Sequence, residues 1–286
     1  MAEGRFIDVE GCNTYCLDQG QGPAIVLMHG ASVAIDATIT WHRTIAHLAR
    51  RFRVLAFDQP GFGRTDMPRG GRYTNRLLRV DHALAVLDRL GIERAILVGH
   101  SEGGFMATRM AILRPSLAAC LVIVTRGGTA PRLGGELDRD WMAASKAAYD
   151  FKGGADSEEG FIRTNSRLTK TSDAPFKQML RENYRRAVAS GQIEMFSARP
   201  AEETDIERYT ELQEKHIHPY LSQLAMPVLI IWAAEDPTVP DERAVALKRL
   251  IPQADLHVFG GTSHMVMLDR SQGFNRLLES WCADGC

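Results

Sequence analysis

The sequence of 286 residues lacks most of the signals that mark a metal protein, a secreted protein or a membrane protein. Its five cysteines are odd in number and scattered, with no CxxC or zinc-ligand spacing, at Cys12, Cys16, Cys120, Cys282 and Cys286. The N-terminus has no basic segment followed by an apolar one, and no apolar run approaches membrane-spanning length. We therefore expect reduced thiols, no metal, and a cytoplasmic protein that makes no contact with a membrane.

A charge excess is also absent, because 34 lysines and arginines stand against 35 aspartates and glutamates, for a formal net charge of −1. No strong field therefore favours nucleic acid or an anionic surface. We expect a small neutral or weakly charged molecule as the partner, and a homo-oligomer is compatible with the sequence. With 45% apolar residues, the chain can bury one large core, so we expect one α/β domain with an inserted cap.

Apolar runs and helical patterns alternate along the chain, as in proteins built from strand-helix-strand units. Segments 6–9 and 14–17 alternate polar and apolar residues around a turn and predict a hairpin. Largely apolar segments, typical of strands buried in a parallel sheet, follow at 24–28, 54–57, 96–98, 121–124, 227–232 and 256–259. Helices are predicted over 41–49, over 75–90 with Thr74 as the N-cap, after residue 101, over 241–250, and from Phe274 to Trp281.

The pattern changes between about residues 127 and 219. This region is rich in charge and in helix-forming residues, with few β-branched runs and several glycine or proline breaks. We interpret it as a helical lid. The chain then divides into a first core part at 1–126, the lid at 127–219 and a second core part at 220–286.

A Gly-x-Ser-x-Gly motif, Gly99-His100-Ser101-Glu102-Gly103, joins a predicted strand to a predicted helix. Such a turn is so tight that a side chain at either glycine would clash with its neighbours. The motif therefore predicts a nucleophile elbow that raises Ser101 at the carboxyl end of the sheet. By itself the pattern is also compatible with a serine that caps the following helix.

A serine hydroxyl is a weak nucleophile at neutral pH, so it needs a base and a group that orients the base. Asp236 and His264 each follow a predicted strand closely, and the order Ser, Asp, His is that of the α/β-hydrolase triad. We predict Ser101 as nucleophile, His264 as base and Asp236 as orienting carboxylate. Their alternatives are Glu235 and Asp241 for the carboxylate and His257 for the base.

These motifs resemble the α/β-hydrolase superfamily along nearly the whole chain. The matching segments are 29–30 (His-Gly), 58–66 (Asp-Gln-Pro-Gly-Phe-Gly-Arg-Thr-Asp), 99–104 (Gly-His-Ser-Glu-Gly-Gly), 234–236 (Ala-Glu-Asp) and 261–264 (Gly-Thr-Ser-His). The resemblance implies an eight-stranded, mostly parallel sheet flanked by helices, with a lid after the sixth strand. It also implies the triad Ser101, His264 and Asp236.

Within the superfamily, the length, the lid position and the segment 123–131 resemble the meta-cleavage-product carbon–carbon hydrolases. The chain departs from that subgroup around the predicted site. It has Ala-Ser-Val-Ala at 31–34 where the subgroup usually has Ser-Gly-Pro-Gly, His100 and Glu102 where it usually has Asn and Met, and Met265 where it usually has Trp. These differences bear on the substrate rather than on the fold.

The remaining site residues are predicted from position. The backbone N–H groups of Ala31 and Glu102 are expected to bind the oxyanion, because rigid backbone donors suit that task. His100 and Met265 are expected to line the substrate pocket, and the subgroup resemblance suggests Arg181 for a substrate carboxylate. The alternatives are a helix-start role for the Glu102 side chain and a solvated helix face for Arg181. His216 and His218 are interpreted as structural residues, with no metal.

We predict a serine hydrolase that needs no cofactor and attacks a carbonyl carbon. The leading hypothesis is cleavage of a carboxylic ester through an acyl-enzyme. The first alternative is hydrolysis of a carbon–carbon bond in a ring-cleavage product or diketone. The second is a ligand-binding, receptor-like protein of the same fold with slow turnover, since a triad does not by itself set the rate.

Overall fold

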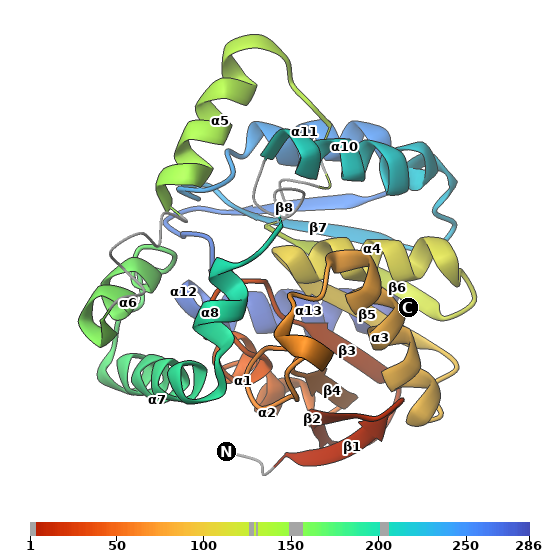
Figure 1. Cartoon of the computed structure of the whole chain (residues 1–286). Coiled ribbons are helices and arrows are strands. Elements are labelled where there is room, and N and C mark those ends of the chain that lie inside the picture. The colour runs from red at the N-terminus through yellow and green to blue at the C-terminus, as the bar shows by residue number, and fades with distance from the viewer. Residues whose placement is uncertain (1–3, 126–128, 130, 149–156, 201–205) are drawn as a thin grey trace.

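The computed structural model describes residues 4–125, 129, 131–148, 157–200 and 206–286 (Figure 1). Its centre is one eight-stranded sheet in the order β1-β2-β4-β3-β5-β6-β7-β8. Strands β1 and β2 pair antiparallel, β2 joins β4 antiparallel, and all later pairs are parallel. The strands are Arg5–Val9, Cys12–Gln19, Ala24–Met28, Arg53–Phe57, Ala95–His100, Ala118–Val124, Val228–Ala233 and Asp255–Phe259 for β1 to β8. The fold class predicted from the sequence, with its N-terminal hairpin and buried strands, is confirmed.

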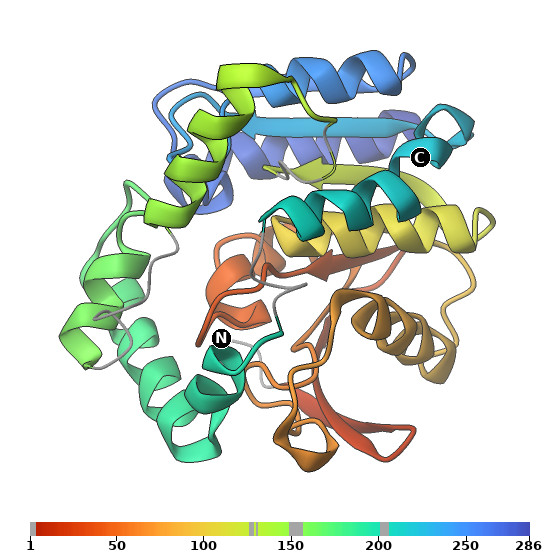
Figure 2. The ribbon, with the colours of Figure 1, turned by 45° about the horizontal axis from the view of Figure 1, so that its top comes forward.

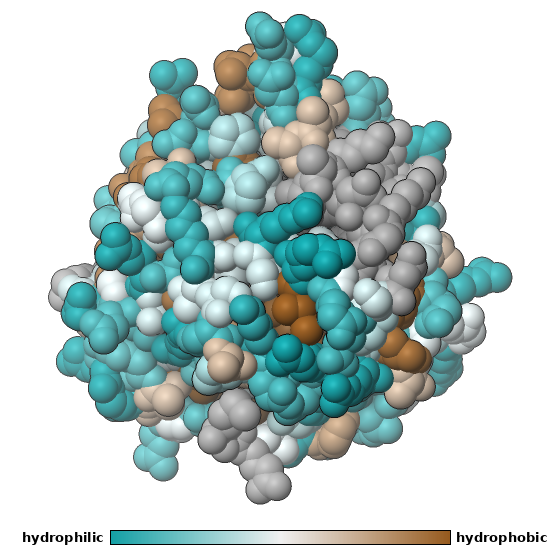
Figure 3. All heavy atoms as spheres, turned by 90° about the vertical axis from the view of Figure 1, so that its left-hand side faces the viewer, coloured by the Kyte–Doolittle hydropathy of each residue, from teal (hydrophilic) through white to brown (hydrophobic). Residues whose placement is uncertain are grey.

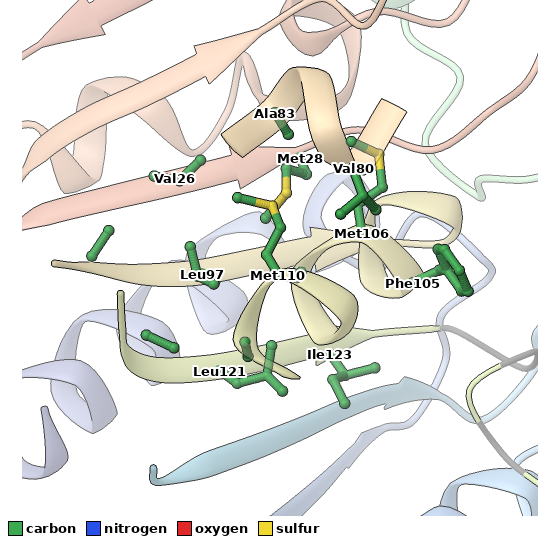
Figure 4. Packing of buried hydrophobic residues seen from close by; sticks show 14 of the residues in the cluster. Val26, Met28, Val80, Ala83, Leu97, Phe105, Met106, Met110, Leu121 and Ile123 are labelled. Atoms are coloured by element: carbon green, nitrogen blue, oxygen red, sulfur yellow. The ribbon is translucent and has the colours of Figure 1, made fainter. Parts of the chain in front are cut away.

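The central strands are apolar on both faces because helices cover both. In β5, Leu97 faces one core cluster while Ile96 and Val98 face the other. The first cluster receives side chains from α3 (Arg76–Arg89) and α4 (Glu102–Leu113), as Figure 4 shows for Val80 and Phe105. The second receives α1 (Ala37–Trp41), α2 (Ile45–Leu48), α12 (Val266–Asp269) and α13 (Ser271–Gly285). Burial of apolar surface on both faces fixes the position of the sheet edge that carries the site.

The long connection between β6 and β7 is helical where it is described. It contains α5 (Gly135–Ala148), α6 (Glu158–Asn165), α7 (Ala174–Ser190), α8 (Gln192–Ser197), α10 (Ile206–His216) and the 3-10 helix η3 (His218–Gln223). Helices α5 to α8 form an arc beside the sheet, whereas α10 runs alongside α4 (Figure 1 and Figure 2). Residues 126–128 and 130, part of the segment that carried the subgroup resemblance, lie outside the described residues. So do 149–156 and 201–205 of the predicted lid.

Two further helical segments complete the described elements, η1 (Arg69–Gly71) and α11 (Glu242–Leu250). The helix predicted over 241–250 is therefore confirmed. No described helix combines the length and the apolar character needed to cross a membrane.

The helix predicted over 41–49 is wrong in its bounds, because the chain forms two short helices, α1 and α2, with a break at residues 42–44. Trp41, Ile45 and Leu48 are nevertheless all buried. Their spacing therefore identified the buried face correctly, but it could not locate the break in the backbone hydrogen bonds. The N-cap of α3 is also one residue later than predicted: Asn75, not Thr74, accepts a hydrogen bond, from the backbone N–H of Leu78.

The expectation of reduced thiols is wrong for two of the five cysteines. Cys120 in β6 and Cys286 at the end of α13 form a disulfide across a sequence separation of 166 residues. Cys12, Cys16 and Cys282 are free. No short spacing signals this pair, because the fold alone brings α13 back to β6. The bond ties the C-terminal helix to the centre of the sheet.

The disulfide is expected to stabilise the fold mainly by restricting the unfolded chain. Cys286→Ser should lower the free energy of unfolding by roughly 2–4 kcal/mol, the range typical of disulfide bonds. Urea unfolding of the oxidised protein, the reduced protein and the variant measures this, with Cys12→Ser as the matched control. The reduced protein and Cys286→Ser should unfold together. Equal midpoints for the oxidised protein and Cys286→Ser would contradict the prediction.

Candidate active site

The predicted elbow is present at the end of β5. Ser101 stands between the last residue of β5 and the first residue of α4 with φ 52° and ψ −121°, a strained conformation for a residue with a side chain. A Cβ on Gly99 would lie 2.0 Å from the Gly103 carbonyl oxygen, and a Cβ on Gly103 would lie 2.2 Å from the Met28 carbonyl oxygen. Both glycines are therefore required for the close approach of strand, turn and helix.

The structure brings His264 and Asp236 into direct contact. His264 Nδ1 lies 2.7 Å from Asp236 Oδ2, and both side chains are almost completely buried. Asp236 follows β7 and His264 follows β8, so the contact forms at the carboxyl ends of neighbouring parallel strands. Since the carboxylate accepts, a neutral ring carries its proton on Nδ1, and this tautomer leaves Nε2 as the acceptor.

Thr238 is a site residue that the sequence reasoning missed. Its backbone N–H and its hydroxyl donate to Asp236 Oδ1 at 2.8 and 2.7 Å, and the Val239 N–H donates to the same oxygen at 3.1 Å. The hydroxyl oxygen also lies 3.1 Å from His264 Nδ1. These donors hold one carboxylate oxygen, so the other faces the imidazole. The turn-forming sequence Asp-Pro-Thr was the available signal.

The backbone of His264 is anchored to the elbow strand and to the end of β6. Its carbonyl oxygen accepts hydrogen bonds from His100 Nε2 at 3.1 Å and from Thr125 Oγ1 at 3.0 Å. The rings of His100 and His264 lie 4.8 Å apart between centroids, and Trp41 packs edge-on against His100. The structure therefore places His100 as a buried neighbour of His264, directly before Ser101.

The loop after β3 passes beside the serine. A Cβ on Gly30 would lie 3.0 Å from Ser101 Cβ and 3.5 Å from Ser101 Oγ, so a glycine suits this close approach. Ala31, predicted as an oxyanion donor, follows directly. Ala34 has a φ of 53°, and its carbonyl oxygen accepts a hydrogen bond from Asn183 Nδ2 of α7 at 3.0 Å. The loop is therefore in contact with the helical insertion.

Asp58, at the start of the 58–66 motif, binds the backbone at the point where the loop after β3 enters α1. Its two carboxylate oxygens accept from the backbone N–H groups of Ala37 and Arg64, each at 2.9 Å. Complete burial, reinforced by the neighbouring Asp36 carboxylate, raises the pKa of Asp58 to about 7.

Glu102 begins α4, as the helix-start interpretation requires, but its side chain has partners that the sequence did not reveal. The carboxylate oxygen Oε1 lies 3.0 Å from Arg76 Nε and 3.1 Å from Arg79 Nη2, and all three side chains are buried. Both arginines belong to α3, in a segment well before the elbow. No local pattern could have identified this ion-pair cluster.

The alternative candidates for the carboxylate and the base have other surroundings in the structure. Glu235 is exposed and forms an ion pair with Lys170. Asp241 precedes α11 without a side-chain capping bond. His257 lies in the exposed edge strand β8, with its ring against Phe259. No described contact joins any of the three to His264. The described residues also contain no group of three histidine, cysteine or acidic side chains that could hold a metal ion.

Met265 is buried directly after His264, and its N–H donates to the Leu168 carbonyl oxygen at 2.8 Å. Its side chain shares a core cluster with Phe161 and Leu168 of the insertion. The structure therefore places Met265 where the core meets the helical insertion.

Arg181 is on α7, where its side chain is 40% exposed and its Nε lies 3.6 Å from Glu158 Oε1. Arg185 approaches the same carboxylate at 2.7 Å. The face that carries α5, α6 and α7 is mainly hydrophilic, with apolar side chains in small separate patches (Figure 3). This setting corresponds to the solvated-face alternative for Arg181.

Arg181→Ala should therefore have a small effect. Exposed ion pairs contribute at most about 1 kcal/mol, so the free energy of unfolding should change by less than that. KM for a substrate with a carboxylate should change by less than about threefold, a factor of three being roughly 0.65 kcal/mol. Steady-state kinetics with Arg185→Ala as the matched control test this. A tenfold rise in KM for Arg181→Ala alone would show that Arg181 binds the substrate.

Comparison with known proteins finds hydrolases of the α/β-hydrolase fold. A family model described as alpha/beta hydrolase fold matches residues 23–271. The 2-hydroxy-6-oxo-2,4-heptadienoate hydrolase of Pseudomonas putida strain F1 is 29% identical, over 98% of this chain and 96% of the relative. The 2-hydroxymuconate semialdehyde hydrolase of Pseudomonas sp. strain CF600 is also 29% identical, over 98% and 94%. The crystal structure of a point mutant of the meta-cleavage product hydrolase CumD superposes with a TM-score of 0.80, 28% identity, and coverage of 99% of this chain and 98% of that one.

Proposed function

Because this chain belongs to the α/β-hydrolase fold family and is a hydrolase, we propose that it cleaves a carbon–carbon bond next to a carbonyl group in a ring-cleavage product. The observation that carries this proposal is the similarity to two ring-cleavage-product hydrolases over at least 94% of their length. The ester reaction, which the sequence alone placed first, has less support than this alternative.

The triad residues have separate tasks in this proposal. Ser101 attacks the substrate carbonyl carbon, while His264 Nε2 accepts the hydroxyl proton. The Asp236 carboxylate accepts the hydrogen bond from Nδ1–H, with 2.7 Å between Oδ2 and Nδ1, and stabilises the imidazolium that forms. The tautomer set by Asp236 leaves Nε2 as the acceptor, which is the form that a base requires.

The developing oxyanion is bound by the backbone N–H groups of Ala31 and Glu102. Two observations support this assignment: Glu102 directly follows Ser101 in the sequence, and Ala31 directly follows Gly30, which approaches Ser101 closely. Backbone donors fixed by an elbow and a strained loop need no reorganisation when charge develops, and each such donor contributes roughly a hundred- to a thousand-fold in rate.

Breaking a carbon–carbon bond requires a leaving group that can hold an electron pair. A dienol substrate first converts to its keto form, so that the pair released from the broken bond is delocalised into a conjugated carbonyl as an enolate. The enolate oxygen then takes a proton to give a 2-hydroxydienoate. Water adds to the acyl carbon, the bond between that carbon and Ser101 Oγ breaks, and a carboxylic acid is released. One water is consumed for each bond cleaved.

The test is a side-by-side assay of a yellow 2-hydroxy-6-oxo-dienoate and a series of short aryl esters. The proposal predicts bleaching of the dienoate with a higher kcat/KM than any ester, and a carboxylic acid and a 2-hydroxydienoate as products. Ester hydrolysis without bleaching would establish the ester reaction instead. Saturable binding of the dienoate in a thermal-shift assay without any product would indicate the receptor-like alternative.

A further inference from the structure

A chain of buried polar contacts connects the two backbone donors of the proposed oxyanion site. It begins at Glu102, whose carboxylate accepts from Arg79 Nη2 at 3.1 Å. The same guanidinium donates from Nη1 to Gln59 Oε1 at 2.7 Å. Arg79 is completely buried, and its planar fork is suited to two acceptors held at a fixed angle. One arginine of α3 therefore joins the start of α4 to the residue after Asp58.

Gln59 continues the chain to the loop after β3 with two contacts to one residue. Its side-chain Nε2 donates to the His29 carbonyl oxygen at 2.7 Å, and its backbone N–H donates to His29 Nε2 at 3.0 Å. Both residues are at most 1% exposed. Gln59 therefore fixes both the backbone position and the ring orientation of His29.

The contact from Gln59 decides the tautomer of His29. Because Nε2 accepts from a backbone N–H, the ring proton must be on Nδ1, and Nδ1 lies 2.7 Å from the Gly30 carbonyl oxygen. Burial lowers the pKa of His29 to about 3, and the charge of Arg79 acts in the same direction. The ring therefore stays neutral near neutral pH and keeps one donor and one acceptor.

The peptide group between Gly30 and Ala31 receives this hydrogen bond and also carries the Ala31 N–H. A hydrogen bond to its carbonyl oxygen fixes the plane of the peptide, and hence the direction of the N–H on the opposite side. It also polarises the peptide, which strengthens the N–H as a donor. The position of His29 therefore controls both the aim and the strength of one oxyanion donor.

The buried ion pairs between Glu102 and the arginines of α3 contribute little net stability. Desolvation of buried ions offsets most of their mutual attraction, and apolar residues of similar volume often stabilise a protein as well or better. The contacts of Arg79 join two segments whose relative position matters for the chemistry.

We propose that Arg79, Gln59 and His29 are positioning residues that hold the Ala31 and Glu102 backbone donors at a fixed separation around the oxyanion. The inference rests on the proposed function, since it requires that an oxyanion forms beside Ser101. It does not depend on whether the substrate is a dienoate or an ester.

The test compares two variants on the same helix. Arg79→Met breaks the chain between Glu102 and Gln59, whereas the control Arg76→Met removes a contact to the same Glu102 oxygen and leaves that chain in place. Arg79→Met should lower kcat roughly ten- to a hundred-fold, less than the loss of a whole oxyanion donor. KM should change by less than about twofold, because the donors act on the transition state. Arg76→Met should lower kcat by less than about threefold, since the chain to Gln59 persists.

A second readout separates positioning from a general structural role. A trifluoromethyl ketone forms a tetrahedral adduct with serine, so its oxygen occupies the oxyanion position. Its affinity should fall with Arg79→Met by the same factor as kcat, while product affinity stays unchanged. Gln59→Met, which interrupts the chain at another point, should reproduce both losses, and the double variant should lose no more than the worse single variant.

The outcomes distinguish this inference from the proposed function. If the wild-type protein neither turns over an ester or dienoate nor binds the ketone, the proposed function fails. If it does so and Gln59→Met and Arg79→Met stay within about threefold of wild type, the positioning role is wrong. Equal losses for Arg76→Met and Arg79→Met, or independent losses for Arg79→Met and Gln59→Met, would also overturn it. Should Arg79→Met not fold, Gln59→Met alone decides.

Discussion

Ser101→Ala should lower kcat by about 10⁴ to 10⁶ fold on any substrate that the wild-type enzyme turns over, the range seen when a nucleophilic serine is removed. In the proposed mechanism the Ser101 hydroxyl forms the covalent bond, whereas the methyl group of alanine fills nearly the same volume in the turn. The φ of 52° at this position penalises serine and alanine alike, so the change in stability should be small.

The measurement is steady-state kinetics of Ser101→Ala against Ser190→Ala, a matched substitution at the exposed end of α7. Ser190→Ala should keep wild-type kcat. Circular dichroism and thermal unfolding show whether both variants are folded. A folded Ser101→Ala enzyme within about tenfold of wild-type kcat would exclude Ser101 as the nucleophile.

Asp236→Asn should lower kcat by about 10⁴ fold, through the tautomer of His264. Three hydrogen bonds, from the N–H and hydroxyl of Thr238 and the N–H of Val239, hold the Oδ1 position as an acceptor. An asparagine will therefore place its carbonyl oxygen there and its NH₂ group toward His264 Nδ1. That NH₂ can only donate, so Nδ1 must lose its proton, and Nε2 gains one. An Nε2 that already carries a proton cannot accept the proton of Ser101.

The control for this variant is Asp241→Asn, a nearby carboxylate without a described contact to His264. It should leave kcat and the pH profile unchanged. Asp236→Asn should also be partly rescued at high pH, where hydroxide can act in place of the base. Similar activities for Asp236→Asn and Asp241→Asn would show that Asp236 does not orient the base.

The elbow and the two later loops were predictable because their signals are local. Gly99 and Gly103 mark a turn that no other residue fits, and Asp236 and His264 each follow a recognisable strand. Parallel strands end at the same edge of a sheet, so strand order alone suffices to bring the loops of β7 and β8 together. The β-sheet and most of its covering helices follow from the same kind of periodicity.

The missed features all depend on contacts between distant segments. The Cys120–Cys286 disulfide joins residues 166 positions apart, and the ion pairs of Glu102 reach to another helix. Neither the disulfide nor the ion pairs can be recognised from residue spacing or composition. The sequence also ranks the ester reaction above carbon–carbon cleavage, because the fold that its motifs indicate does not determine the substrate.

Intact-mass measurement after treatment with a phosphonate probe shows whether Ser101 is the activated nucleophile of a triad. We expect one covalent adduct on the wild-type protein, located at Ser101 by peptide mapping, and no adduct on Ser101→Ala. Asp236→Asn should form the same adduct much more slowly, because its base is in the wrong tautomer. An unmodified wild-type protein, or an adduct that persists on Ser101→Ala, would show that Ser101 is not the activated nucleophile.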